Sequence, residues 1–92
     1  MSNRFNNVWD AIEDTEEQAA SMRARAELMI ALQERIAALK LTQAKAAKLL
    51  CVTQPRISDL MRGRIDLFSL ETLLDMLSHT GIKVQFRMKK VA

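Results

Sequence analysis

Apolar residues recur along most of the chain with the spacing of helix faces, and this pattern predicts a series of helices. The first covers residues 5–12, where one stripe runs at i, i+3, i+4 and i+7. Thr15 and Gln18 have capping-box spacing and begin a second predicted helix, which continues to about residue 39. The stripe of the first helix is Phe5, Val8, Trp9 and Ile12, and the inward face of the second is Met22, Met29, Leu32, Ile36 and Leu39.

Two short helices follow in the middle of the chain, and each is opened by a threonine. Thr42 is the predicted N-cap of an Ala-rich helix over residues 43–50, and Thr53 is the N-cap of the next helix. That helix tolerates Pro55 in its first turn and has its predicted left-handed stop at Gly63. The spacing indicates two crossing helices joined at residues 51–53, with the inward residues Ala46, Ala47, Leu50, Val52, Ile57 and Leu60.

The last third of the chain changes its period. Ser69 is the predicted N-cap of a helix that stops at Gly81, with Phe68 and Leu73 placed as a hydrophobic staple. From residue 82 onward apolar and polar residues alternate, which predicts a half-buried strand. No second strand is visible, so we expect this strand to pair with its copy in a second subunit; a helical or frayed tail is the alternative. The apolar residues of the strand are Ile82, Val84, Phe86 and Met88.

The amino-acid composition fits this helical pattern and argues against several other classes of protein. The chain has 92 residues, 49% of them hydrophobic, with only two glycines and one proline, which is typical of one folded domain. The predicted class is all-α: a five-helix domain with one C-terminal β-strand that pairs across a dimer. The N-terminus has no leader-like apolar region and no stretch is long enough to span a bilayer, so we expect a cytoplasmic protein without membrane contact.

The sequence contains few residues that could serve in catalysis or in metal binding. The single cysteine, Cys51, and the single histidine, His79, leave no intramolecular disulfide and no clustered metal ligands. The carboxylates of the N-terminal region form an exposed polar run with no pocket implied. We therefore expect neither an enzyme nor a bound cofactor or metal.

Charge is distributed unevenly along the chain. Residues 1–20 hold one basic and five acidic residues, a net −4, whereas the remaining 72 residues hold 13 basic and 6 acidic residues, a net +7. Within residues 35–64, seven basic residues face a single acid, Asp59. This balance predicts a polyanionic partner for the centre of the chain and a different role for its N-terminal arm.

The segments TQAKAAKLL, CVTQPRISDLMRG and SLETLLDML resemble the Cro/repressor-type helix-turn-helix of the XRE family over residues 42–81. The resemblance implies that the second of the two short helices lies in the major groove of double-stranded DNA. An ordinary helical hairpin with a basic outer face is the alternative. The chain then divides into an acidic N-terminal arm with a short amphipathic helix (1–20), a helix-turn-helix domain (21–81) and a C-terminal strand with a basic tail (82–92).

The start of the second short helix is where base reading is expected. Gln54 suits adenine and Arg56 suits guanine, because each can make two parallel hydrogen bonds. Asp59 has two open roles, accepting from cytosine or forming an ion pair with Arg56 or Arg62, and we favour the ion pair. Gln43 resembles the family residue that touches phosphate and steadies the reading glutamine. The predicted base-reading set is Thr53, Gln54, Pro55, Arg56, Ser58 and Asp59, and the predicted phosphate set is Gln43, Lys45, Lys48, Arg62 and Arg64.

One position departs from the family pattern. The family usually has glycine at the turn position held here by Cys51, because that residue adopts a positive φ. We therefore expect a somewhat strained backbone at Cys51.

Taken as a whole, the chain is similar to the HigA-like antitoxins of the XRE group. That resemblance implies an autoregulatory repressor that also binds a small basic ribonuclease toxin. A homodimer on a near-palindromic site is expected separately, because a monomer would read only half a site. The N-terminal stripe centred on Trp9 suits a helix-in-groove contact with such a toxin. Folding of that stripe onto the protein's own helices or dimer is the alternative, and so is a stand-alone phage-type regulator with no toxin.

Overall fold

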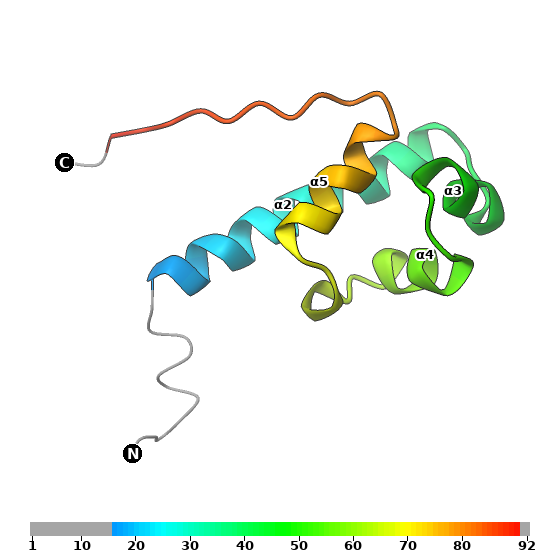
Figure 1. Ribbon diagram of the computed structural model, residues 1–92, viewed down its shortest axis with the longest axis horizontal. Coiled ribbons are helices and arrows are strands. Elements are labelled where there is room, and N and C mark those ends of the chain that lie inside the picture. Colours follow the sequence, from blue (N-terminus) through cyan, green and yellow to red (C-terminus); the bar gives the residue numbers. More distant parts are fainter. Residues whose placement is uncertain (1–15, 91–92) are drawn as a thin grey trace, which may run out of the picture.

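The computed structural model describes residues 16–90, and in this range the chain is built from four α-helices and one turn of 3₁₀ helix. They are α2 (Glu16–Ala38), α3 (Gln43–Leu50), α4 (Gln54–Met61), η1 (Ile65–Leu67) and α5 (Leu70–Ser78), as Figure 1 shows. The all-helical class is confirmed for these residues, but a count of five helices is not, because the helix predicted over 5–12 lies outside them. No helix in residues 16–90 has the length and apolar character needed to cross a membrane.

All three of the later helices begin at the predicted N-caps. The side-chain oxygens of Thr42, Thr53 and Ser69 accept hydrogen bonds from the backbone N–H three residues further on, at 3.2, 3.4 and 3.1 Å. Each bond satisfies one of the N–H groups that a helix leaves unpaired in its first turn. Hydroxyl side chains therefore fix where each of these helices starts.

Three helices end on a residue in the left-handed conformation. Lys40, Cys51 and Gly63 have φ values of 56°, 60° and 75°. At each end, the N–H groups of that residue and the next donate to carbonyls three and five residues back, which is the Schellman arrangement. The positive φ at Cys51 and the stop at Gly63 are confirmed, whereas the stop at Lys40 carries no Gly or Pro signal in the sequence.

The core lies between α2 and α5, which pack side by side, and the α3–α4 pair, which lies next to them at the C-terminal end of α2 (Figure 1). The predicted inward residues of α3 and α4 are buried, and Val52 is half-buried against the core. Two predictions for the second helix are wrong: Met22 and Leu39 are 46% and 39% exposed. Met22 lies on the end of α2 that extends past the other helices, and Leu39 follows the last residue of α2. The buried core is Met29, Leu32, Ile36, Ala46, Ala47, Leu50, Ile57, Leu60, Phe68, Leu73, Met76 and Leu77.

Residues 82–90 follow α5 as a segment without helix or strand, so the predicted C-terminal strand is not present within this single chain. The physical reason is that, among residues 16–90, no other extended segment is available to form a ladder with it. Its backbone makes no hydrogen bond to another element of the described chain. Ile82 and Val84 pack against the core, whereas Phe86 and Met88 are 68% and 89% exposed.

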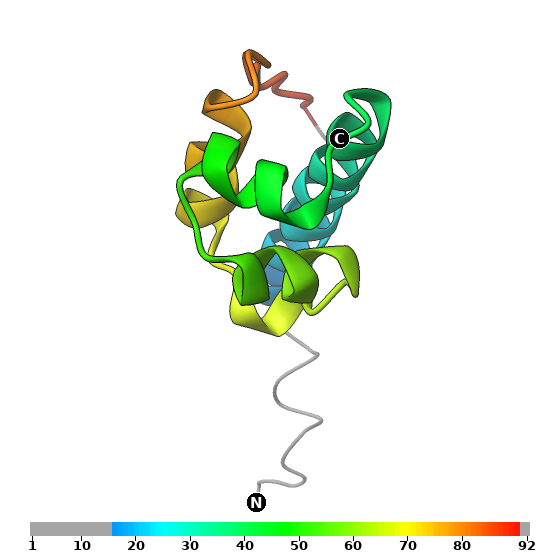
Figure 2. The same cartoon turned by 90° about the vertical axis from the view of Figure 1, so that its right-hand side faces the viewer.

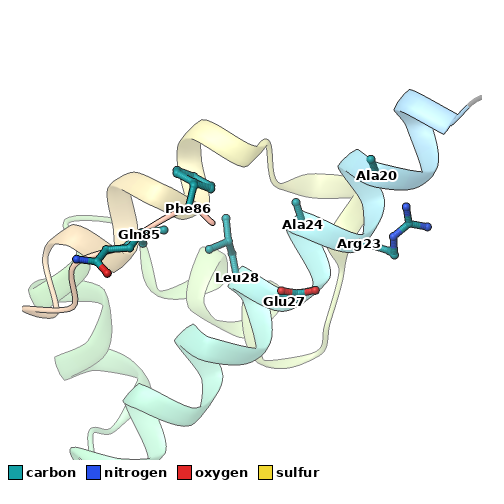
Figure 3. Close-up of a pocket in the computed structure, with 8 residues that line it drawn as sticks. Ala20, Arg23, Ala24, Glu27, Leu28, Gln85 and Phe86 are labelled. Carbon is teal, nitrogen blue, oxygen red and sulfur yellow. The ribbon is translucent and has the colours of Figure 1, made fainter. Parts of the chain in front are cut away.

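A groove separates this segment from the N-terminal half of α2. Ala20, Ala24 and Leu28 line it from the helix, and Val84 and Phe86 line it from the segment. Figure 3 shows Leu28 on α2 and Phe86 on the C-terminal segment among the side chains that line this space. The groove lies along α2, away from the helix pair α3–α4.

Candidate nucleic-acid interface

The pair α3–α4 has the geometry of a helix-turn-helix. Figure 2 shows the two helices crossing, with the turn between them at one side. Ala46 and Ala47 are buried at 0% and 8% exposure, and their small side chains let the backbones of the two helices approach closely. The turn consists of Cys51 and Val52, and Thr53 then caps α4. The crossing angle is thus set by small buried residues and by a left-handed residue in the turn.

The helix α4 has one buried and one exposed face. Ile57 and Leu60 are fully buried, whereas Thr53, Gln54 and Pro55 are exposed at its start. Two other members of the predicted base-reading set, Ser58 and Asp59, are half-buried. The exposed first turn is therefore the part of α4 that is open to a large ligand.

Arg56 differs from its neighbours in the first turn. It is half-buried, and its guanidinium carbon lies 4.2 Å from the centre of the Phe68 ring, a cation–π distance. Phe68 is only 1% exposed. The structure therefore places the guanidinium against the protein rather than with the exposed side chains of Gln54 and Pro55.

The predicted ion pair of Asp59 with Arg56 or Arg62 is absent from the described chain. Arg56 lies over Phe68, and Nη2 of Arg62 donates to Oγ of Ser58 at 3.2 Å. Each arginine that was a candidate partner for Asp59 is thus engaged elsewhere. The Asp59 side chain has no ion-pair partner among residues 16–90, and its backbone carbonyl accepts from the N–H of Arg64 at 3.1 Å.

The predicted phosphate-contacting residues are all exposed on α3 or just after α4: Gln43, Lys45, Lys48, Arg62 and Arg64. Neither α3 nor α4 has an acidic residue in its first turn. The positive ends of both helix dipoles are therefore not neutralised by a neighbouring carboxylate. Together with the basic side chains, they form a surface suited to a polyanion.

Two comparisons with known proteins agree with this geometry. Residues 11–89 match the family of helix-turn-helix domains. A solved structure, whose name provisionally assigns it to the XRE family of transcriptional regulators, superposes with a TM-score of 0.74 at 30% identity, covering 79% of this chain and 82% of the other. The chain belongs to the XRE family. None of the curated proteins matches the sequence.

In this XRE protein, α4 is also held at its C-terminal end. Nε2 of Gln33, on α2, donates to the backbone carbonyl of Leu60 at 2.8 Å. This carbonyl in the last turn of α4 also accepts from the backbone N–H of Gly63 at 3.1 Å, so the amide of Gln33 adds a second hydrogen bond from a different helix. No pattern in the sequence indicates this role of Gln33, because a glutamine in a long helix is ordinarily a surface residue. Phe68 was expected to be buried as part of a staple, but its contact with Arg56 was not.

The described part of this XRE protein holds no group of three or more residues of the types that bind metal ions. Cys51 is an exposed free thiol in the turn. His79 caps the end of α5, where its Nδ1 lies 2.8 Å from the carbonyl of Asp75. Both residues thus lie at the C-terminal end of a helix.

Proposed function

We propose that this XRE protein is a sequence-specific DNA-binding transcriptional regulator that reads bases with α4 in the major groove. The observation that carries the proposal is the division of α4 into two faces. Ile57 and Leu60 fix the helix to the core, and Gln54 and Pro55 are exposed in its first turn. A helix presented in this way fits the major groove of B-DNA, which is about 12 Å wide.

Gln54 is the principal base reader in this proposal. It is exposed, it is the first residue of α4, and a glutamine amide can bond to N6 and N7 of adenine at once. Thr53 and Pro55 lie beside it, and Ser58 and Asp59 continue the same surface one turn on. The prediction that Arg56 reads a guanine requires its guanidinium to leave the Phe68 ring first.

Phosphate contacts supply affinity without specificity. Lys45 and Lys48 on α3, and Arg62 and Arg64 after α4, are exposed and flank the reading turn on both sides in sequence. Gln43 begins α3 next to the cap Thr42 and carries an amide that can donate to a phosphate. These contacts set the position of the protein on the duplex.

A homodimer on a near-palindromic site completes the proposal, because one α4 reads only half a site. Residues 82–88 support this arrangement, since their backbone is unpaired within the described chain and Phe86 and Met88 are exposed. Antiparallel pairing centred on Gln85 would place Ile82 opposite Met88 and Val84 opposite Phe86 of the second copy. Sedimentation of the full chain with and without DNA tests whether the protein is a dimer. A Phe86→Asp variant should be monomeric in the same experiment.

The narrower role of autoregulatory antitoxin is supported by the resemblance to HigA-like proteins alone. Its predicted toxin-binding residues (Phe5, Val8, Trp9 and Ile12) lie outside residues 16–90. Co-expression with the neighbouring reading frames tests this role. A small basic ribonuclease retained by the full chain, and lost with the Trp9→Ala variant, would support it; retention of no protein would favour a stand-alone regulator. In either case the protein acts by binding and not by catalysis.

The proposal is tested by selecting binding sites from a pool of random duplexes with the full chain. We expect one sequence to be enriched, and Gln54→Ala to weaken binding to it by about 1–3 kcal/mol, with a much smaller loss on random DNA. Gln18→Ala is the matched control, because it is the same substitution at an exposed residue of α2, outside α3, α4 and the proposed dimer strand. Failure to enrich any sequence, with binding that only follows salt, would contradict specific reading.

A further inference from the structure

The side chain of Arg56 joins two helix starts. Its guanidinium lies over the ring of Phe68, which directly precedes Ser69, the N-cap of α5. Arg56 itself stands in the first turn of α4, and its backbone N–H donates to the cap Thr53 at 3.4 Å. The contact therefore links the turn that carries Gln54 to the fixed end of a different helix.

A cation in the first turn of a helix is in an unfavourable place, because the helix dipole is positive there. The face of an aromatic ring provides the negative potential that compensates such a charge. Phe68 is 1% exposed, so its ring lies within the protein and cannot itself reach DNA. Arg56 covers it from the side of α4. Withdrawing Arg56 to reach a base would uncover that ring and leave the cation beside the helix dipole.

We propose that Arg56 is a positioning residue rather than a base reader: its guanidinium, seated on Phe68, holds the first turn of α4 so that Gln54 meets its base. This inference depends on the proposed DNA-binding function and refines it. Arg56 acts through the backbone it steadies. The base sequence that the protein prefers is then set by the exposed side chains of α4 and does not include a guanine read by Arg56.

The test compares Arg56→Met, Phe68→Leu and the double variant of the full chain. Binding is measured to the enriched duplex and to random DNA, well below the melting temperature of each variant. Arg56→Met keeps the aliphatic stem and removes the cation, and circular dichroism verifies that Phe68→Leu is folded. Arg62→Met is the matched control, because it is the same substitution at an exposed arginine at the end of α4.

We expect Arg56→Met and Phe68→Leu each to lower the ratio of specific to random binding by about fivefold or more. The double variant should have a ratio no lower than that of either single variant, because the effects of two substitutions in contact with each other do not add. Arg56→Lys should recover part of the loss because it keeps a cation. Repeating the site selection with Arg56→Met should enrich the wild-type sequence. Arg62→Met should weaken specific and random binding equally, with a loss that adds to that of Phe68→Leu.

Two results would overturn the inference while leaving the DNA-binding function intact. The first is a changed base preference at one position for Arg56→Met together with normal binding by Phe68→Leu, which would make Arg56 a base reader. The second is a lower melting temperature with an unchanged ratio of specific to random binding, which would make the contact only structural. If the wild-type chain enriches no sequence, the DNA-reading function itself fails, and this inference fails with it.

Discussion

Replacing Cys51 by glycine should make the protein more stable, although it removes a side chain. Cys51 has φ 60° and ψ 41°, in the left-handed region. An L-residue there costs about 1–2 kcal/mol, which glycine avoids. Glycine also loses more backbone entropy on folding, and this loss reduces the gain in stability by about 0.4–1 kcal/mol. Because the side chain is exposed, little packing is lost. The middle of these ranges leaves an expected net gain of about 0.8 kcal/mol, equivalent to a rise of about 3–6 °C in melting temperature for a chain of this size.

Urea and thermal denaturation of wild-type and Cys51→Gly protein measure this gain. Cys51→Ala keeps the Cβ atom and with it the strain, so its stability should stay near the wild type. Lys40→Gly repeats the experiment at the other left-handed non-glycine residue, with φ 56°. Ala37→Gly, at an exposed position inside α2, is the opposite control and should lose about 0.5–1 kcal/mol. A Cys51→Gly midpoint at or below that of the wild type, with an unchanged m-value, would refute the strain argument.

Three further predictions concern the reading helix and its supports. Lys48→Gln should weaken binding to specific and to random DNA equally. In a salt titration it should also make the slope of log K against log salt concentration shallower by about one. Weaker binding to the specific site alone would contradict a phosphate contact. Gln33→Leu removes the donor to the Leu60 carbonyl and should cost about 0.5–1.5 kcal/mol in urea denaturation. Thr53→Ala should cost about 1 kcal/mol, and Thr53→Ser should cost little, because serine also caps a helix; equal losses would argue against the cap.

The local rules of helix formation account for the part of the fold that the sequence predicts well. Hydroxyl caps at Thr42, Thr53 and Ser69 depend on the residue and its immediate neighbours, so they can be found without knowledge of the tertiary structure. The buried faces of α3 and α4 follow from apolar spacing in the same way. The predicted surface of Gln54 and Pro55 follows as the complement of those faces.

The features that could not be predicted from the sequence depend on contacts between segments that are distant along the chain. Met22 has helical spacing with the core residues of α2, yet it is exposed because none of the later helices extends along that end of α2. The contact of Arg56 with Phe68 requires the first turn of α4 to meet the residue before the N-cap of α5, and no pattern in either segment indicates it. Lys40 stops α2 without glycine, so the tight turn before α3 overrides the intrinsic preference of the residue.

The division of α4 into a buried anchoring face and an exposed start has a consequence for the evolution of regulators built on this domain. The residues that anchor the helix, Ile57 and Leu60, are fully buried, and the exposed residues of its first turn contribute nothing to the core. Mutations at Gln54 or Pro55 can therefore accumulate without endangering folding. A duplicated gene could acquire a new operator within a few substitutions, and the same exchange could be engineered by transplanting only the exposed residues of α4.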